Sequence, residues 1–114
     1  MKVAVVHEID YRRERERIRC TLQHESWLFV TLPRVGEMMA FSTADESETV
    51  GLEVSSLGWH VAVGLVSVFT APWLTDNSRG DTYVEATRRE VVRRLRILRA
   101  AGFDCGPTRE FETA

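Results

Sequence analysis

One feature limits the folds open to this chain more than any other: its only clear helical pattern comes last. Residues 82–101 carry an apolar stripe at helical spacing, made of Val84, Val91, Leu95 and Leu98. Thr82 and Glu85 have the spacing of a capping box, and Gly102 suits the position just after a helix. Everything before this segment has a strand-like pattern. A long sheet followed by one late helix favours an α+β fold over alternating α/β units.

The segments before the helix divide into short apolar or alternating runs separated by polar turns. Residues 2–8 are rich in β-branched side chains, and residues 17–23 alternate between apolar and polar. Residues 37–41 form another expected strand after the corner at Pro33 and Gly36, and the acidic residues 42–48 form a loop. Short turns between neighbouring strands favour antiparallel pairing.

Two runs are apolar on both faces and are therefore expected to be central strands. They are WLFVTL, residues 27–32, and the long run at residues 58–73, where Gly64 predicts a bulge or a bend. Trp27 and Trp59 are expected in the core, as most tryptophans of small domains are. We predict a curved, mostly antiparallel sheet, or a partial barrel, of five to six strands with the long C-terminal helix packed on it.

The chain is expected to be a single domain over residues 1–114, a length that suits one hydrophobic core. The strands lie within residues 2–70, residues 71–81 form a loop, the helix spans about 82–101, and a short tail covers 102–114.

A cytoplasmic location is expected, with no membrane partner. No apolar run approaches the length of a membrane-spanning helix, and the run after Lys2 stops at Val6, too short for a signal-peptide core. Cys20 and Cys105, the only two cysteines, have no metal or redox spacing and are predicted to be small buried side chains.

The helix is unusually rich in arginine. Residues 88–99 contain six arginines and one glutamate, a net charge of +5. Arg89, Arg93 and Arg96 project opposite the apolar stripe, while Arg88 and Arg99 flank it. Three interpretations stay open: the solvated side of an amphipathic helix, a phosphate-binding surface, or a surface that meets the acidic loop of another subunit.

Two hydrophobic residues belong to the same candidate binding surface. Ile97 falls on the arginine-rich side of the helix, where water is expected, and Trp73 lies beside Pro72 in the loop before the helix. Trp73 either covers the end of the sheet or lines a binding surface.

No motif in the chain indicates catalysis. His7–Glu8 and His24–Glu25 are neighbours on strands and point to opposite faces, so they cannot act on one substrate. No histidines, cysteines or carboxylates stand at a recognised metal spacing, and no nucleophile elbow or phosphate-binding glycine loop is present. We therefore expect a protein that is not an enzyme and uses no cofactor, metal or small-molecule ligand.

The stretch TLPRVGEMMAF, followed by VGLEVSSLGWHVAVGLVSVF, resembles short uncharacterised bacterial proteins that begin a strand with Pro-x-Val-Gly-Asp/Glu. The resemblance covers about residues 27–70 and depends on Pro33, Val35, Gly36 and Glu37. It implies a small curved sheet or barrel and no particular activity. The long C-terminal helix departs from that pattern.

The leading functional hypothesis is a binding or adaptor domain that acts through protein–protein contacts, self-association among them. Residues 27–32 and 59–69 are apolar on both faces, and a single helix covers only one. The alternative is nucleic-acid binding through the arginine-rich helix face. The net charge of −2 and the absence of aromatic residues between the arginines count against it.

Overall fold

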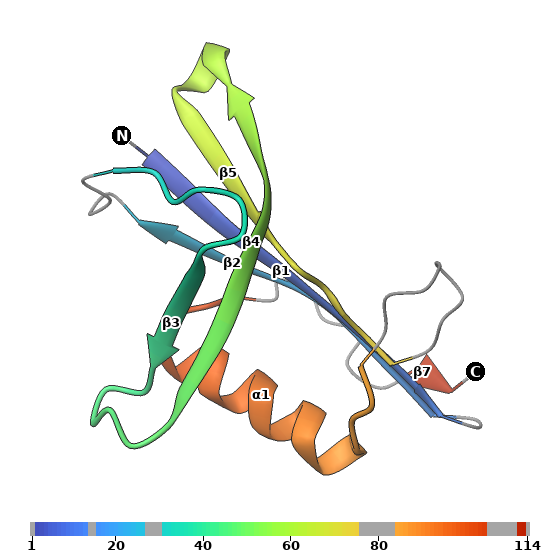
Figure 1. Ribbon diagram of the computed structural model, residues 1–114. Helices are drawn as coiled ribbons and strands as arrows, with labels where there is room; N and C mark the ends of the chain where they lie inside the picture. The colour runs from blue at the N-terminus through green and yellow to red at the C-terminus, as the bar shows by residue number, and fades with distance from the viewer. Residues whose placement is uncertain (1, 14–15, 27–30, 76–83, 105–111, 114) are drawn as a thin grey trace.

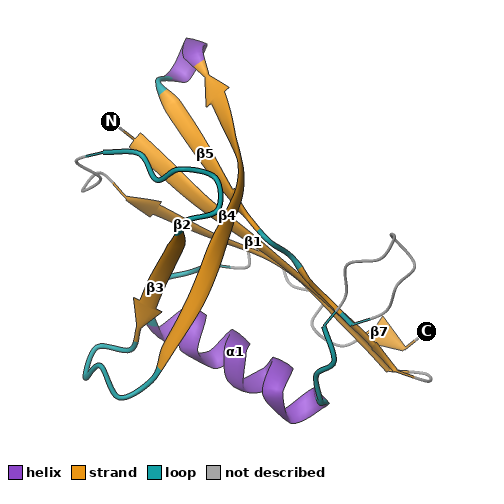
Figure 2. Ribbon diagram, in the orientation of Figure 1, coloured by secondary structure: helices purple, strands orange, loops and turns teal. Residues whose placement is uncertain are grey.

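The protein has an α+β fold with an α-helix beneath a twisted sheet (Figures 1 and 2). The computed structural model describes residues 2–13, 16–26, 31–75, 84–104 and 112–113. The helix is α1 (Arg88–Ala100), and the strands within these ranges are β1 (Lys2–Arg13), β2 (Glu16–Ser26), β3 (Met38–Ser42), β4 (Thr49–His60), β5 (Leu65–Thr70), β6 (Trp73–Leu74) and β7 (Glu112–Thr113).

The sheet is mixed but mostly antiparallel, in the order β3-β4-β5-β1-β2-β7, and the short β6 also pairs with β1. Only β5 and β6 run parallel to β1; the other pairs are antiparallel. The predicted α+β class and mostly antiparallel pairing are confirmed. Over the described residues the sheet stays open, with β3 and β7 at its two ends, and does not close into a barrel.

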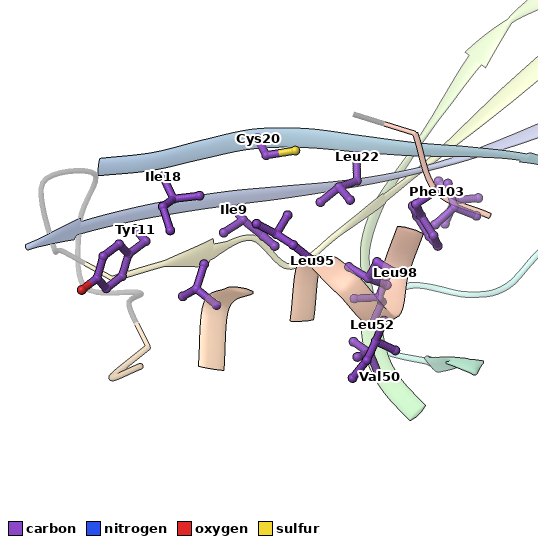
Figure 3. Packing of buried hydrophobic residues seen from close by; sticks show 14 of the residues in the cluster. Ile9, Tyr11, Ile18, Cys20, Leu22, Val50, Leu52, Leu95, Leu98 and Phe103 are labelled. Carbon is purple, nitrogen blue, oxygen red and sulfur yellow. The ribbon is translucent and has the colours of Figure 1, made fainter. Parts of the chain in front are cut away.

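The long β1–β2 hairpin contributes a large share of the hydrophobic core. Ile9 pairs with Cys20 and Tyr11 with Ile18, so alternate side chains of both strands face the same side and are buried there (Figure 3). This period of two is what a sheet with one covered face requires. The predicted alternation of residues 17–23 and the burial of Cys20 are both confirmed, whereas Cys105 lies outside the described residues.

β4 links two parts of the sheet by changing its partner half-way. Residues 49–53 pair with β3, and residues 54–60 pair with β5. The register of the β4–β5 pairing shifts between Val54 and Ser56, just beyond the change of partner, and an irregularity of this kind bends a strand and increases its twist. The lower half buries Val50 and Leu52 against α1, while the upper half continues past the helix (Figures 1 and 3).

The prediction of one central strand within residues 58–73 is wrong. The chain reverses there, because Val61–Val63 form a 3₁₀ turn that ends at Gly64 in the left-handed conformation, with φ 62°. Glycine adopts this conformation without a steric penalty. The predicted bend at Gly64 is present, but it reverses the chain and closes the β4–β5 hairpin instead of bending a single strand. Trp59, expected in the core, lies near the hairpin end and is 61% exposed.

The predicted central strand at residues 27–32 is not found in the part of the chain that can be tested. Residues 27–30, which include Trp27, lie outside the described residues. Thr31 and Leu32 are described but are not in a strand. Leu32 packs on the edge of the core as a partly buried side chain.

The helix begins six residues later than predicted and is about 20 Å long instead of 30 Å. Val84 donates its N–H to the Leu74 carbonyl at 2.7 Å, which ties this part of the chain to β6 instead of to a helical turn. The helix cap is Thr87, whose side chain accepts the Glu90 N–H at 3.2 Å. The capping pattern Thr-x-x-Glu therefore occurs at Thr87, and the predicted cap at Thr82 lies outside the described residues.

The end of the helix is as predicted. Gly102 has φ 105° and donates its N–H to the Arg99 carbonyl, while the Phe103 N–H bonds to the Leu98 carbonyl. This pair of bonds is the Schellman motif. It returns Phe103 to the core, where its ring meets Phe41 edge-on at 4.9 Å between centroids.

Ile97 is fully buried, so the prediction that it faces water is wrong. It lies about 120° around the helix from Val91, well outside the expected stripe. α1 packs against β1 on one side and against β3 and β4 on another (Figure 1). Because the helix lies in the angle between these strands, a wider arc of its surface is covered than one sheet face would cover.

Candidate functional site

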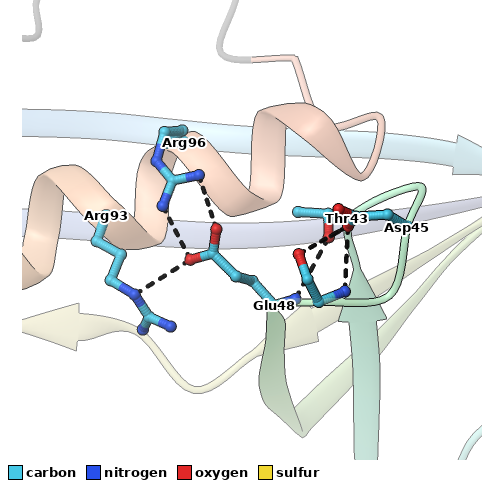
Figure 4. Close-up of polar contacts among 6 residues, drawn as sticks. Thr43, Asp45, Glu48, Arg93 and Arg96 are labelled. Atoms are coloured by element: carbon cyan, nitrogen blue, oxygen red, sulfur yellow. Dashed lines mark hydrogen bonds and ion pairs between the residues drawn. The ribbon is translucent and has the colours of Figure 1, made fainter.

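Two of the arginines predicted to form a binding surface are held by an acid of the same chain. Arg96 makes a double hydrogen bond to the Glu48 carboxylate at 2.9 and 2.8 Å, and Arg93 approaches the same group at 3.3 Å (Figure 4). The hydrogen bonds from Arg96 lower the pKa of Glu48. The acidic loop that was considered as a contact from another subunit therefore meets the arginines within one molecule.

That acidic loop is shaped by its own side chains. The Asp45 carboxylate accepts hydrogen bonds from the Thr43 and Ser47 hydroxyls, both at 2.7 Å, and from the Ser47 N–H at 3.1 Å. These bonds lower the pKa of Asp45 to about 2. Such a turn orders the backbone before β4 and presents Glu48 to the helix (Figure 4).

The remaining arginines of this face differ in their surroundings. Arg88 forms an ion pair with Glu16 of β2, and Arg89 is exposed on the first turn of α1. Arg99 is also exposed but takes part in a further interaction. Much of the helix charge is thus matched by acids of the sheet and its loops.

Trp73 does not join these arginines. It lies on β6, is partly buried against the core, and has the Arg94 guanidinium 4.0 Å above the centre of its ring. Such a cation–π contact stabilises a partly desolvated arginine. The residues predicted to form one binding surface therefore do not lie together. Ile97 is in the core, Trp73 is partly buried against it, and Arg89 is exposed.

Arg94 also completes a buried polar network between helix and sheet. Its Nε–H donates to His7 Nε2 at 3.2 Å, and its NH2 group donates to the Gly51 carbonyl at 3.3 Å. With Nε2 accepting, His7 Nδ1–H donates to the Thr70 hydroxyl at 2.9 Å, which in turn donates to the Val6 carbonyl. Burial first, and the charge of Arg94 second, lower the pKa of His7 to about 3.

This network can hold the helix in place but offers no route for a substrate. His7 is fully buried and Thr70 nearly so. Two hollows on the described surface are lined by other residues. A buried polar group without a partner is costly, so satisfied donors and acceptors here fix how α1 sits on β1 and β4.

The most exposed apolar surface of the described residues is the tip of the β4–β5 hairpin. Val61 is 89% exposed and Val63 71%, and Trp59 precedes them on β4. The hairpin extends beyond the part of the sheet that α1 covers (Figure 1). We call this surface, residues 59–64, the hairpin tip. Val66 at its base is buried, so the core ends where the tip begins.

A shallow hollow of about 250 Å³ lies along the tip, and its lining is almost wholly apolar. The lining residues are Trp59, His60, Val61, Gly64, Leu65 and Val66. His60 is exposed, and its Nε2 lies 3.0 Å from the Ser67 hydroxyl.

A signal for this surface was present in the sequence. Residues 54–75 contain no Asp, Glu, Lys or Arg, although these make up 28% of the chain. Buried strands explain part of such a stretch, but its exposed residues at the tip are uncharged as well. Surfaces that stay in water are normally rich in charge, whereas the centres of interfaces are depleted of it.

Comparisons with protein-family models, with curated protein sequences and with solved structures found no match to this chain. Among the described residues, no group of histidine, cysteine or acidic side chains is placed to hold a metal ion. Over the same residues, no helix has the length and apolar content that crossing a membrane requires. Function is therefore inferred from the chain's own surface.

Proposed function

We propose that this protein is a non-catalytic binding domain that acts through protein–protein contacts and that the hairpin tip is its contact surface. One observation carries the proposal: Trp59, Val61 and Val63 are exposed together, at the end of a hairpin, in a stretch without charge. Exposed apolar side chains that gather on one surface are typical of interaction sites. Tryptophan in particular is enriched among the residues that dominate binding energy.

The arginine-rich helix face ranks below the tip as a binding surface. Phosphate groups would have to compete with Glu48 for Arg93 and Arg96, and with Glu16 for Arg88.

Self-association tests the proposal without a known partner. We expect sedimentation equilibrium at micromolar concentrations to give a mass above that of one chain. Val61→Glu combined with Val63→Glu should abolish this. Burying a valine contributes about 1.5 kcal/mol, so the loss of two raises the dissociation constant by about 100-fold or more.

Val92→Glu is the matched control, because it changes an exposed valine of α1 in the same way. It should leave association unchanged. A wild-type chain that remains a monomer throughout, or a tip variant that associates as well as wild type, would refute the tip as the surface for self-association.

A further inference from the structure

We propose that the partner at the hairpin tip is a second copy of this chain and that the two copies pair antiparallel along the upper half of β4, residues 55–60. The two sheets would then join into one across a two-fold axis. This inference rests on the proposed function and adds to it the identity of the partner and the mode of contact.

The free edge of β4 is the first observation. At Val54 that edge is occupied, since the Gly36 N–H donates to the Val54 carbonyl at 2.8 Å and the Val54 N–H donates to the Glu37 carbonyl at 2.9 Å. Beyond Val54, within the described part of the chain, the strand's ladder pairing is with β5 on its other side. Among the described residues, no strand therefore pairs with the second row of backbone groups of residues 55–60.

The composition of this edge is the second observation. Exposed strand edges are usually protected by lysine, other charges, proline or a covering segment. The opposite side of the sheet follows this rule: Gln23 of β2 exchanges backbone hydrogen bonds with Asp104 at 2.9 and 2.8 Å, and β7 pairs farther along. Residues 55–60, in contrast, contain neither a charged residue nor a proline.

Gly58 places no side chain on the edge strand, and an aromatic ring occupies the space beside it. The Phe69 ring of β5 lies over it, and a Cβ on Gly58 would come within 3.1 Å of that ring. The ring covers the glycine from the neighbouring strand, and Phe69 is itself 39% exposed. An aromatic ring over a strand glycine stabilises pairing that the glycine alone would weaken.

Charge and symmetry favour a second copy over another protein. Two identical strands that pair antiparallel form a self-complementary contact, and an edge without charge brings no like charges together. Lys2, at the end of β1 next to the tip, is already paired with Glu25 at 3.1 Å. The surface offers no charged group with which to select a charged partner.

The contact area that a stable dimer needs favours strand pairing over a contact between the two hairpin tips alone. A tryptophan that is 61% exposed offers roughly 100–150 Å². A stable interface needs about 800 Å² from each partner, far more than a few tip side chains supply. A paired edge of six residues extends the contact over about 20 Å and adds backbone hydrogen bonds.

Amide hydrogen exchange followed by NMR tests the pairing directly. At concentrations where the chain self-associates, we expect every second amide within residues 55–60 to become protected, and to lose that protection on dilution. Alternation is specific to strand pairing, because only alternate N–H groups of a strand face one edge. Protection that does not change with concentration would overturn the inference.

A charge on the edge provides the second test. Ser56→Lys places a lysine on the exposed edge strand without touching residues 59–64 and should weaken the dimer at least about tenfold. Thr21→Lys, at an exposed position of β2, is the matched control and should dimerise as wild type does. Wild-type circular dichroism in both variants confirms the fold.

The outcomes separate the two proposals. If Ser56→Lys dimerises like wild type while Val61→Glu with Val63→Glu does not, the tip binds and only edge pairing is refuted. If wild type is a monomer at all concentrations, self-association fails as well. A monomer that binds neutral phosphatidylcholine vesicles would replace both proposals with insertion of the tip into a lipid surface.

Discussion

Acidification should destabilise this protein well above the pH at which its carboxylates titrate, because the fold holds His7 neutral. His7 is fully buried, accepts a hydrogen bond from Arg94 and donates one to Thr70. A proton on Nε2 would remove the acceptor and place a second positive charge against the guanidinium. The pKa of His7 is accordingly lowered from 6.5 to about 3.

The sign and size of the effect follow from proton binding by the two states. Between pH 6.5 and about 3, the unfolded chain binds a proton at His7 that the folded chain does not. The contribution of His7 to stability is therefore complete above its unfolded pKa and is lost progressively as the pH falls below it. At about 1.4 kcal/mol per pKa unit, the loss is about 2 kcal/mol at pH 5 and about 4–5 kcal/mol once the pH reaches 3.

Urea unfolding followed by circular dichroism at about pH 7.5 and pH 5 measures this loss, since free energy falls linearly with denaturant. The carboxylates of Asp45 and Glu48 do not explain a loss measured between these two pH values, because their pKa values are lowered from 3.8 and 4.5. His7→Gln removes the titrating group. The variant will be less stable, but its free energy of unfolding should change little between these two pH values. A variant that loses as much stability as wild type would show that another group causes the effect.

Three further predictions test other parts of the structure. Ile97→Ala should lower the free energy of unfolding by about 2–4 kcal/mol, measured by urea denaturation, because a buried side chain leaves a cavity; a loss below about 0.5 kcal/mol would mean that the side chain is exposed. Gly102→Ala should cost more than Gly36→Ala in thermal unfolding: both glycines have positive φ, but only at Gly102 would the new Cβ meet the His24 ring, at 3.0 Å. Equal losses would contradict the close contact. Glu48→Gln should make the protein elute from heparin at higher salt by releasing its two arginine partners, and unchanged elution would show that these arginines are already available to anions.

How far the sequence predicted the fold depends on the distance over which each signal acts. Alternation in β2 and the glycine at position 102 act within a few residues, and the structure agrees with both. The helix start was misplaced because two capping patterns occur in succession. The helix begins after Thr87, because the Val84 N–H is already bonded to the Leu74 carbonyl of β6 and the backbone of Thr87 is extended. That bond joins residues ten apart, farther than the capping patterns reach, so those patterns could not reveal it.

The candidate site shows the same division. By itself, the sequence determined that residues 54–75 carry no charge and that the final segment forms an arginine-rich helix. Only the tertiary structure decided that Ile97 is covered, that Trp59 is not, and that Glu48 forms ion pairs with two arginines. The physical reason is that periodicity fixes which side chains share a face, whereas burial depends on what packs against that face. Here a bend at Gly64 moved one apolar run out into water, and β3 and β4 covered a helix surface that looked free.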